Sequence, residues 1–175
     1  MTNERFLYGA SVQGIQKFIF QTNELKDIVG ASDLVENICK EAFTEFETNG
    51  TKIVGAAGNI KYEFNDEESC AKAVKNFNKK VLKMAPGITI SQAVVKFEDG
   101  NFQKAVSDLE LKLRIQRNKP VSNSFVGLIG ISRSPKTGMP AVKSVKNELI
   151  DEATQEKRAQ KHVTSKLCTK CFGEN

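Results

Sequence analysis

The chain has 175 residues, of which 39% are hydrophobic and 27% charged, and its formal net charge is +5. This composition is far from that of a disordered chain, and no apolar run approaches the roughly 20 residues of a membrane span. The amino terminus lacks the basic and then apolar start of a secretion signal, so we expect a cytoplasmic protein with reduced cysteines.

Basic residues gather in the carboxyl-terminal part of the chain. Residues 101–175 carry 14 Lys and Arg against 7 Asp and Glu, whereas residues 1–100 carry 12 against 14. A basic segment suits a phosphate-bearing partner such as RNA, and a solvated helix face is the alternative. The candidate nucleic-acid-binding residues close one predicted helix: Lys112, Arg114, Arg117 and Lys119. A second basic group follows at Lys157, Arg158, Lys161, Lys166 and Lys170.

The first elements are predicted from strand composition and helical spacing. Residues 5–12 favour a strand, which ends at Gly14, and Ile15, Phe18 and Ile19 are then spaced as one face of a helix. After a break at TNELKDIVGAS, Ser32 is the predicted N-cap of a second helix. Its expected buried stripe consists of Leu34, Ile38, Ala42 and Phe46.

The stretch IVGAAGNIKYEF, residues 53–64, predicts a hairpin of two short strands. In its second strand Ile60, Tyr62 and Phe64 alternate with charged residues, so one face should be buried. Asn65 and Glu68 then resemble a capping box that opens a third helix. That helix should bury Cys70, Val74, Phe77 and Val81.

A further strand is predicted over residues 88–97, followed by the basic helix over residues 101–117. The basic helix should pack through Phe102, Val106, Leu109 and Leu113. The order strand, helix, hairpin, helix, strand is the split βαβ arrangement of a ferredoxin-like fold. We therefore expect an α+β domain over residues 1–117, with an antiparallel sheet and helices on one face.

Two stretches carry a resemblance to a known family. SVQGIQKFIFQTNELKDIVGASDLVE, residues 11–36, is similar to the start of the palm domains in the large, polymerase/cyclase-like subunit of type III CRISPR effector complexes. The hairpin lies where active members of that family carry GGDD. The chain looks most like the first of the two palms in such subunits, the copy that usually lacks the catalytic signature.

The chain departs from the active palm pattern at the metal ligands. Ser11 stands where the resemblance places the first-strand Asp, and Gly58 and Asn59 stand at the paired aspartates. Because Mg²⁺ in phosphoryl transfer needs hard, normally anionic oxygen ligands, we expect catalytic Mg²⁺ only through a partner palm and no turnover by this chain alone. The alternative for the hairpin glycines is a tight turn without a ligand.

A palm without catalysis could hold ATP as one half of a composite site. The candidate nucleotide-binding residues are Ser11, Gln13, Gly14, Ser32, Gly55, Ala56, Ala57, Gly58 and Asn59. The resemblance implies a role in RNA-guided antiviral defence, in which the partner palm turns ATP into cyclic oligoadenylate.

Cys168 and Cys171 have the spacing of two Zn²⁺ ligands, and a structural site needs four. His162 is a weaker candidate ligand. A zinc ribbon follows the first palm in the resembling subunits, so we interpret residues 164–175 as half of such a ribbon, completed by residues after Asn175.

Residues 118–163 are expected to form an extension. It should contain a strand over residues 125–131, a loop, and a charged helix over residues 143–161. The apolar anchors of that helix are Val145, Leu149 and Ala153.

Two other functions remain open beside the degenerate palm. One is a stand-alone nucleotidyl cyclase or polymerase with metal ligands from elsewhere, such as Asp27 or Asp33, although Asp33 is expected in the first turn of a helix. The other is an RNA-binding module that stacks bases on exposed strand aromatics. The candidate aromatics are Tyr62, Phe64 and Phe97, although packing in the core explains them as well.

Overall fold

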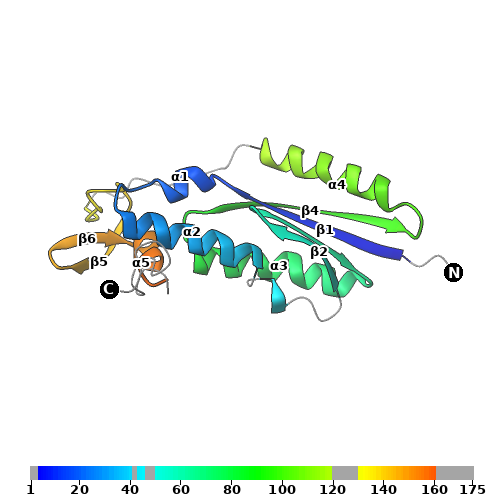
Figure 1. Cartoon of the computed structure of the whole chain (residues 1–175), viewed down its shortest axis with the longest axis horizontal. Coiled ribbons are helices and arrows are strands. Elements are labelled where there is room, and N and C mark those ends of the chain that lie inside the picture. Colours follow the sequence, from blue (N-terminus) through cyan, green and yellow to red (C-terminus); the bar gives the residue numbers. More distant parts are fainter. Residues whose placement is uncertain (1–3, 41–42, 46–49, 120–129, 161–175) are drawn as a thin grey trace, which may run out of the picture.

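A four-stranded antiparallel sheet organises the computed structural model, which describes residues 4–40, 43–45, 50–119 and 130–160 (Figure 1). Its strands are β1 (Glu4–Gln13), β2 (Gly50–Ala56), β3 (Asn59–Phe64) and β4 (Thr89–Glu98). They lie in the order β2-β3-β1-β4, which is the ferredoxin-like order and confirms the predicted α+β class.

Three helices cover one face of the sheet: α1 (Ile15–Ile19), α2 (Leu25–Lys40) and α3 (Glu67–Met84). The inward residues of β3 are buried, as their alternation predicts. Phe43 lies at the centre of this core, with its ring centroid 4.1 Å from that of Tyr62 and 5.0 Å from that of Phe77. Aromatic packing of this kind stabilises a core beyond the area that it buries.

The opposite face of the sheet is covered by α4 (Phe102–Arg117), so the prediction of helices on one face is wrong (Figure 1). Leu109 and Leu113 are buried there, whereas Phe102 is 39% exposed, with its ring centroid 5.8 Å from that of Phe97. The close approach depends on Gly9, where an added Cβ would lie 2.8 Å from the Leu109 side chain. Sequence periodicity located the buried stripe of α4, but it could not specify which face of the sheet the stripe meets.

Two predicted helix starts are wrong. Helix α2 begins at Leu25, so Ser32 lies inside the helix and donates its hydroxyl to the Ile28 carbonyl rather than capping a terminus. Helix α3 is capped by Asp66, whose carboxylate accepts the Ser69 amide at 2.7 Å, and not by Asn65. Both Asn and Asp can cap helices, so the sequence rule could not separate these neighbours.

Residues 130–160 form a small unit beside α1 and α2, which we call the C-terminal unit (Figure 1). It contains a hairpin of β5 (Ala141–Val145) and β6 (Glu148–Asp151), followed by α5 (Glu152–Arg158). The single helix predicted over residues 143–161 is therefore wrong. Lys146 and Asn147 both have positive φ, 49° and 64°, which turns the chain back where a helix was expected.

Several predictions fall outside the described residues. These are the buried positions Ala42 and Phe46, nearly all of the strand predicted over residues 125–131, and the half zinc ribbon with Cys168, Cys171 and His162. Among the helices that the structure describes, none is long and apolar enough to cross a membrane.

Candidate functional site at the ends of β1 and β3

Ser11 and Asn59 lie directly opposite each other on neighbouring strands. Direct partners in an antiparallel pair project from the same face, so both side chains lie on the α4 face of the sheet, beyond the residues that α4 covers. Ser11 is buried and Asn59 is exposed. Gln13 lies on the same face and donates from its amide to the Ser11 hydroxyl oxygen at 3.1 Å. The site therefore presents hydroxyl and amide groups, all without charge.

The β2–β3 turn next to this site is held in place from two sides. Ala57 and Gly58 have φ of 52° and 78°, the left-handed pair of a two-residue hairpin turn. The Gly58 carbonyl accepts the Val12 amide at 2.7 Å, and the Gly58 amide donates to the Cys39 sulfur at 3.2 Å. Burial raises the pKa of the Cys39 thiol, and the hydrogen bond from Gly58 opposes that rise. Both polar groups of the Gly58 backbone are thus engaged inside the protein.

At two positions of the hairpin, close packing within the protein is enough to explain why the residue is glycine, and no ligand is needed. A Cβ on Gly58 would lie 2.7 Å from Cδ1 of Ile15, and one on Gly55 would lie 2.8 Å from the Cys39 carbonyl oxygen. Gly14 differs, because it is exposed and its positive φ of 67° leads the chain into α1. Ala56, Ala57 and Asn59 are the exposed positions of the turn, and the Asn59 side-chain amide donates to the Ala57 carbonyl at 3.3 Å.

The structure brings together most of the predicted nucleotide-binding residues but not Ser32. Ser11, Gln13, Gly14 and the β2–β3 turn lie side by side. Ser32 lies on α2, which packs on the opposite face of the sheet. Sequence reasoning missed Cys39, which supports the turn from α2, and Ser91, which pairs with Ser11 from β4. No local pattern marks either residue.

The acidic residues named as alternative metal ligands lie elsewhere. Asp27 is fully buried on α2 and binds Arg158 at 2.6 Å. Asp33 lies within α2 and not in its first turn as predicted. Over the described ranges, no group of three or more His, Cys, Asp or Glu could hold a metal ion. Neutral oxygens at Ser11 and Asn59 do not fit a catalytic Mg²⁺ by themselves.

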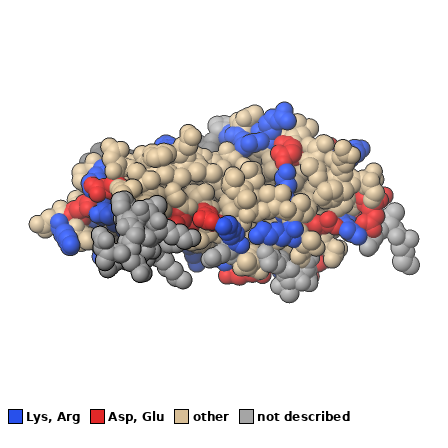
Figure 2. Space-filling model, viewed as in Figure 1, with Lys and Arg blue, Asp and Glu red and all other residues tan. Residues whose placement is uncertain are grey.

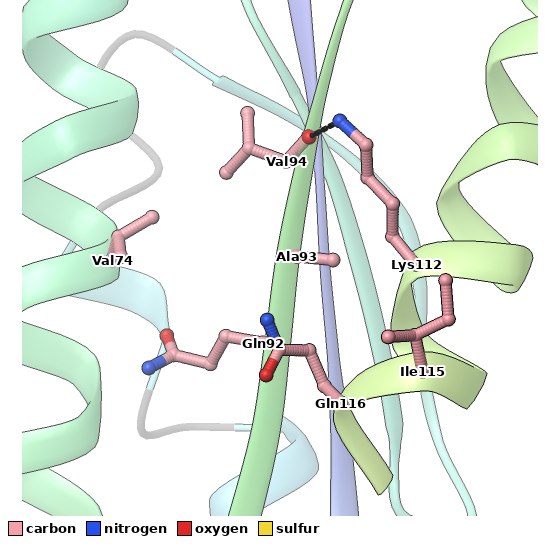
Figure 3. Close-up of a pocket in the computed structure, with 7 residues that line it drawn as sticks. All are labelled: Val74, Gln92, Ala93, Val94, Lys112, Ile115 and Gln116. Atoms are coloured by element: carbon pink, nitrogen blue, oxygen red, sulfur yellow. Dashed lines mark hydrogen bonds between the residues drawn. The ribbon is translucent and has the colours of Figure 1, made fainter. Parts of the chain in front are cut away.

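Lys112 of α4 lines a groove of about 430 Å³ beside β4, which is an edge strand of the described sheet (Figure 3). Lys112 donates from Nζ to the Val94 carbonyl at 2.9 Å, so it covers an edge acceptor that another strand could pair with. Arg114, Arg117 and Lys119 are exposed, and Figure 2 shows basic side chains gathered over this helix.

Two of the alternatives considered for nucleic-acid contacts do not fit the structure. Tyr62 and Phe64 are fully buried and Phe97 is nearly so, so they cannot stack on bases. Lys157 is buried and Arg158 forms ion pairs, so neither is a free phosphate contact. The core and the C-terminal unit account for these side chains instead.

Comparisons with known proteins give a fold. No family model and no curated protein matches the chain. Among solved structures, a Csm1-Csm4 cassette in complex with cA4 matches with a TM-score of 0.56 and 17% identity over 66% of this chain and 19% of that chain. A Csm1-Csm4 cassette in complex with pppApApA matches with a TM-score of 0.57 and 17% identity over 81% of this chain and 23% of that chain.

A third structure, the cassette in complex with AMPPNP, matches with a TM-score of 0.56 and 17% identity over 66% of this chain and 19% of that chain. This chain thus spans about a fifth of the length of the chains that it matches. At this level of identity the comparisons show a Csm1-like palm fold.

Proposed function

We propose that this chain is a non-catalytic palm of a type III CRISPR effector large subunit, which binds ATP as one half of a composite cyclic oligoadenylate synthase site. The observation that carries the proposal is the pair of Ser11 and Asn59, opposite each other at the strand ends of a Csm1-like palm fold. These neutral side chains can donate hydrogen bonds to a nucleotide, but they cannot offset the charge of Mg²⁺.

The similar structures support a nucleotide as the ligand. They are described as complexes with AMPPNP, cA4 and pppApApA, all of which carry adenine and phosphate. In this proposal a second palm supplies the carboxylates and the Mg²⁺ that assist phosphoryl transfer. Cys168 and Cys171 belong to a Zn²⁺ site completed from outside this chain, and the complex acts in the cytoplasm.

ATP titration of the full chain by calorimetry tests the proposal. We expect binding with and without Mg²⁺ and no product by chromatography. Asn59→Ala should weaken ATP binding about fivefold, because one hydrogen bond of about 1 kcal/mol is lost. The control Asn76→Ala, on the exposed side of α3, should bind ATP as the wild type does. Turnover by the isolated chain would overturn the proposal in favour of the stand-alone cyclase.

The missing carboxylates can also be put back. The double variant Ser11→Asp/Asn59→Asp should gain Mg²⁺ binding in the presence of ATP, because it creates two adjacent anionic ligands. Asn76→Asp is a control that adds a carboxylate away from the site. Equal Mg²⁺ binding by the wild type and the double variant would contradict the proposed reason for the loss of catalysis.

RNA binding is the second candidate function, favoured by the exposed cations at the end of α4. With single-stranded oligouridine as the probe, Arg114→Ala/Arg117→Ala should reduce the slope of log affinity against log salt by about 1.4. The control Lys75→Ala/Lys79→Ala removes two exposed cations from α3. Equal slopes for the two double variants would count against a specific site on α4.

A further inference from the structure

The side chain of Lys157 is fully buried where the C-terminal unit meets α1. Its Nζ donates to the Phe18 carbonyl at 2.7 Å and to Oε1 of Gln21 at 3.1 Å, and it lies 4.2 Å from the centre of the Phe18 ring. A buried ammonium is costly unless it is well paired. The contacts with Phe18 and Gln21 therefore fix one geometry between α5 and the end of α1.

Helix α1 has only five residues and cannot be stable without tertiary contacts. Its last carbonyl groups have no partner within the helix, and a cation at this end is favourable. Lys157 supplies such a cation at Phe18. At the other end of α1, Ile15 lies so close to Gly58 that no Cβ would fit between them. Helix α1 is thus held between Lys157 and the turn of the candidate nucleotide site.

Helix α5 packs closely against α2. A Cβ on Gly30 would lie 1.8 Å from the Lys157 carbonyl oxygen, so the two backbones touch. Arg158 adds hydrogen bonds to Asp27 at 2.6 and 3.1 Å and to Glu148 at 3.1 Å. Asp27 also accepts the Thr22 hydroxyl at 3.0 Å. A shift of α5 against the palm would therefore move the end of α1 with it.

We propose that Lys157 is a positioning residue for the candidate nucleotide site. It holds α1 so that Gln13 and Gly14, which directly precede this helix, keep their place beside the β2–β3 turn. Through it, the docking of α5 on the palm affects nucleotide binding. The link to nucleotide binding rests on the proposed function, whereas the hold on α1 does not.

Hydrogen exchange of the full chain tests the hold on α1 without any ligand. Lys157→Met keeps the length of the side chain and removes its donors. Amide protection of residues 14–20 should fall about tenfold, the effect of one charge-assisted hydrogen bond, while β3 and α3 keep theirs. The control is Lys136→Met in the C-terminal unit, which removes one ion pair to Glu148 and one to Glu24 of the palm. It should leave residues 14–20 protected.

A milder variant keeps the test informative if Lys157→Met does not fold. Gln21→Ala removes one acceptor and leaves the bond from Lys157 to Phe18, so protection of residues 14–20 should fall about threefold. Unchanged protection in both variants, or an equal loss through the palm and the C-terminal unit, would overturn the positioning role.

ATP titration separates this inference from the proposed function. Lys157→Met should weaken ATP binding several-fold, and Lys136→Met should not. If exchange changes as expected but ATP affinity does not, the link to the site is overturned. If the wild type itself does not bind ATP, the proposed function fails, and the exchange result still decides whether Lys157 holds α1.

Discussion

The palm and the C-terminal unit are held together by different chemistry. The palm closes on an apolar core of strand and helix side chains with Phe43 at its centre. The C-terminal unit joins the palm through Ala153, which packs in that core, and through charged groups that cross the boundary: Arg158 with Asp27, Lys136 with Glu24, and Lys157 with the Phe18 carbonyl. Apolar burial is not directional and tolerates small shifts, whereas a buried charge network is stable only when it is complete. The difference suggests that the palm is the stable part and that the unit is the one that can be released.

The largest expected effect lies in the palm core. Phe77→Ala should lower the free energy of unfolding by about 3–5 kcal/mol, because it leaves a cavity beside the Phe43 ring. Urea denaturation followed by circular dichroism measures this loss. Leu82→Ala on the exposed side of the same helix is the control and should change stability by less than about 0.5 kcal/mol. Equal losses for the two variants would contradict the described core.

The second effect is the release of the C-terminal unit. Arg158→Met leaves Asp27 buried without its cation, which should weaken docking by roughly 3 kcal/mol. Limited proteolysis and hydrogen exchange should show opening of residues 141–158 and of the end of α1, which Lys157 holds, while the rest of the palm keeps its urea midpoint. Arg133→Met removes an exposed cation from the same unit and should leave docking unchanged. If the urea midpoint of the palm fell as well, the proposed difference in stability between the palm and the C-terminal unit would be contradicted.

Acid should loosen the C-terminal unit before it unfolds the palm, because Glu148 and both of its partners lie within this unit. Hydrogen bonds from Arg158 and Lys136 lower the pKa of Glu148 from its ordinary 4.5 to about 2. A lowered carboxyl pKa gives stability that is fully present above pH 4.5 and is lost as the pH falls through about 2. Protection of residues 141–158 should therefore decline over this range. Glu148→Gln should reduce this loss of protection at low pH. If protection of the variant declined with pH as in the wild type, a group other than Glu148 would be responsible.

The smallest effect concerns the cap of α3. Asp66→Ala should lower the midpoint of thermal unfolding by about 3 °C, because the Ser69 amide loses its acceptor. Asn65→Ala should leave the midpoint unchanged, since the structure assigns the cap to its neighbour. A larger fall of the midpoint in Asn65→Ala than in Asp66→Ala would indicate that Asn65, the residue predicted from the sequence, is the cap. Neither variant should affect docking of the C-terminal unit.

Local patterns predicted much of the palm and little of the C-terminal unit. Alternation identified Ile60, Tyr62 and Phe64 as the buried face of β3, and the turn residues placed the hairpin. Near the site, the family resemblance singled out Ser11 and Asn59, which the strand register brings together. The helix expected over residues 143–161 was wrong because its spaced apolar residues also suit a hairpin, and only the turn at Lys146 and Asn147 separates the two.

The sequence by itself determined the order of the palm elements, the apolar faces of its strands and helices, and the neutral side chains at the site. These features depend on residues close together along the chain. Only the tertiary structure decided that α4 covers the second face, that Ser32 lies away from Ser11, and that Lys157 is buried against Phe18. Each of these features depends on contacts between segments that are far apart in the sequence. The contact between Lys157 and Phe18, for example, cannot be predicted from either segment alone.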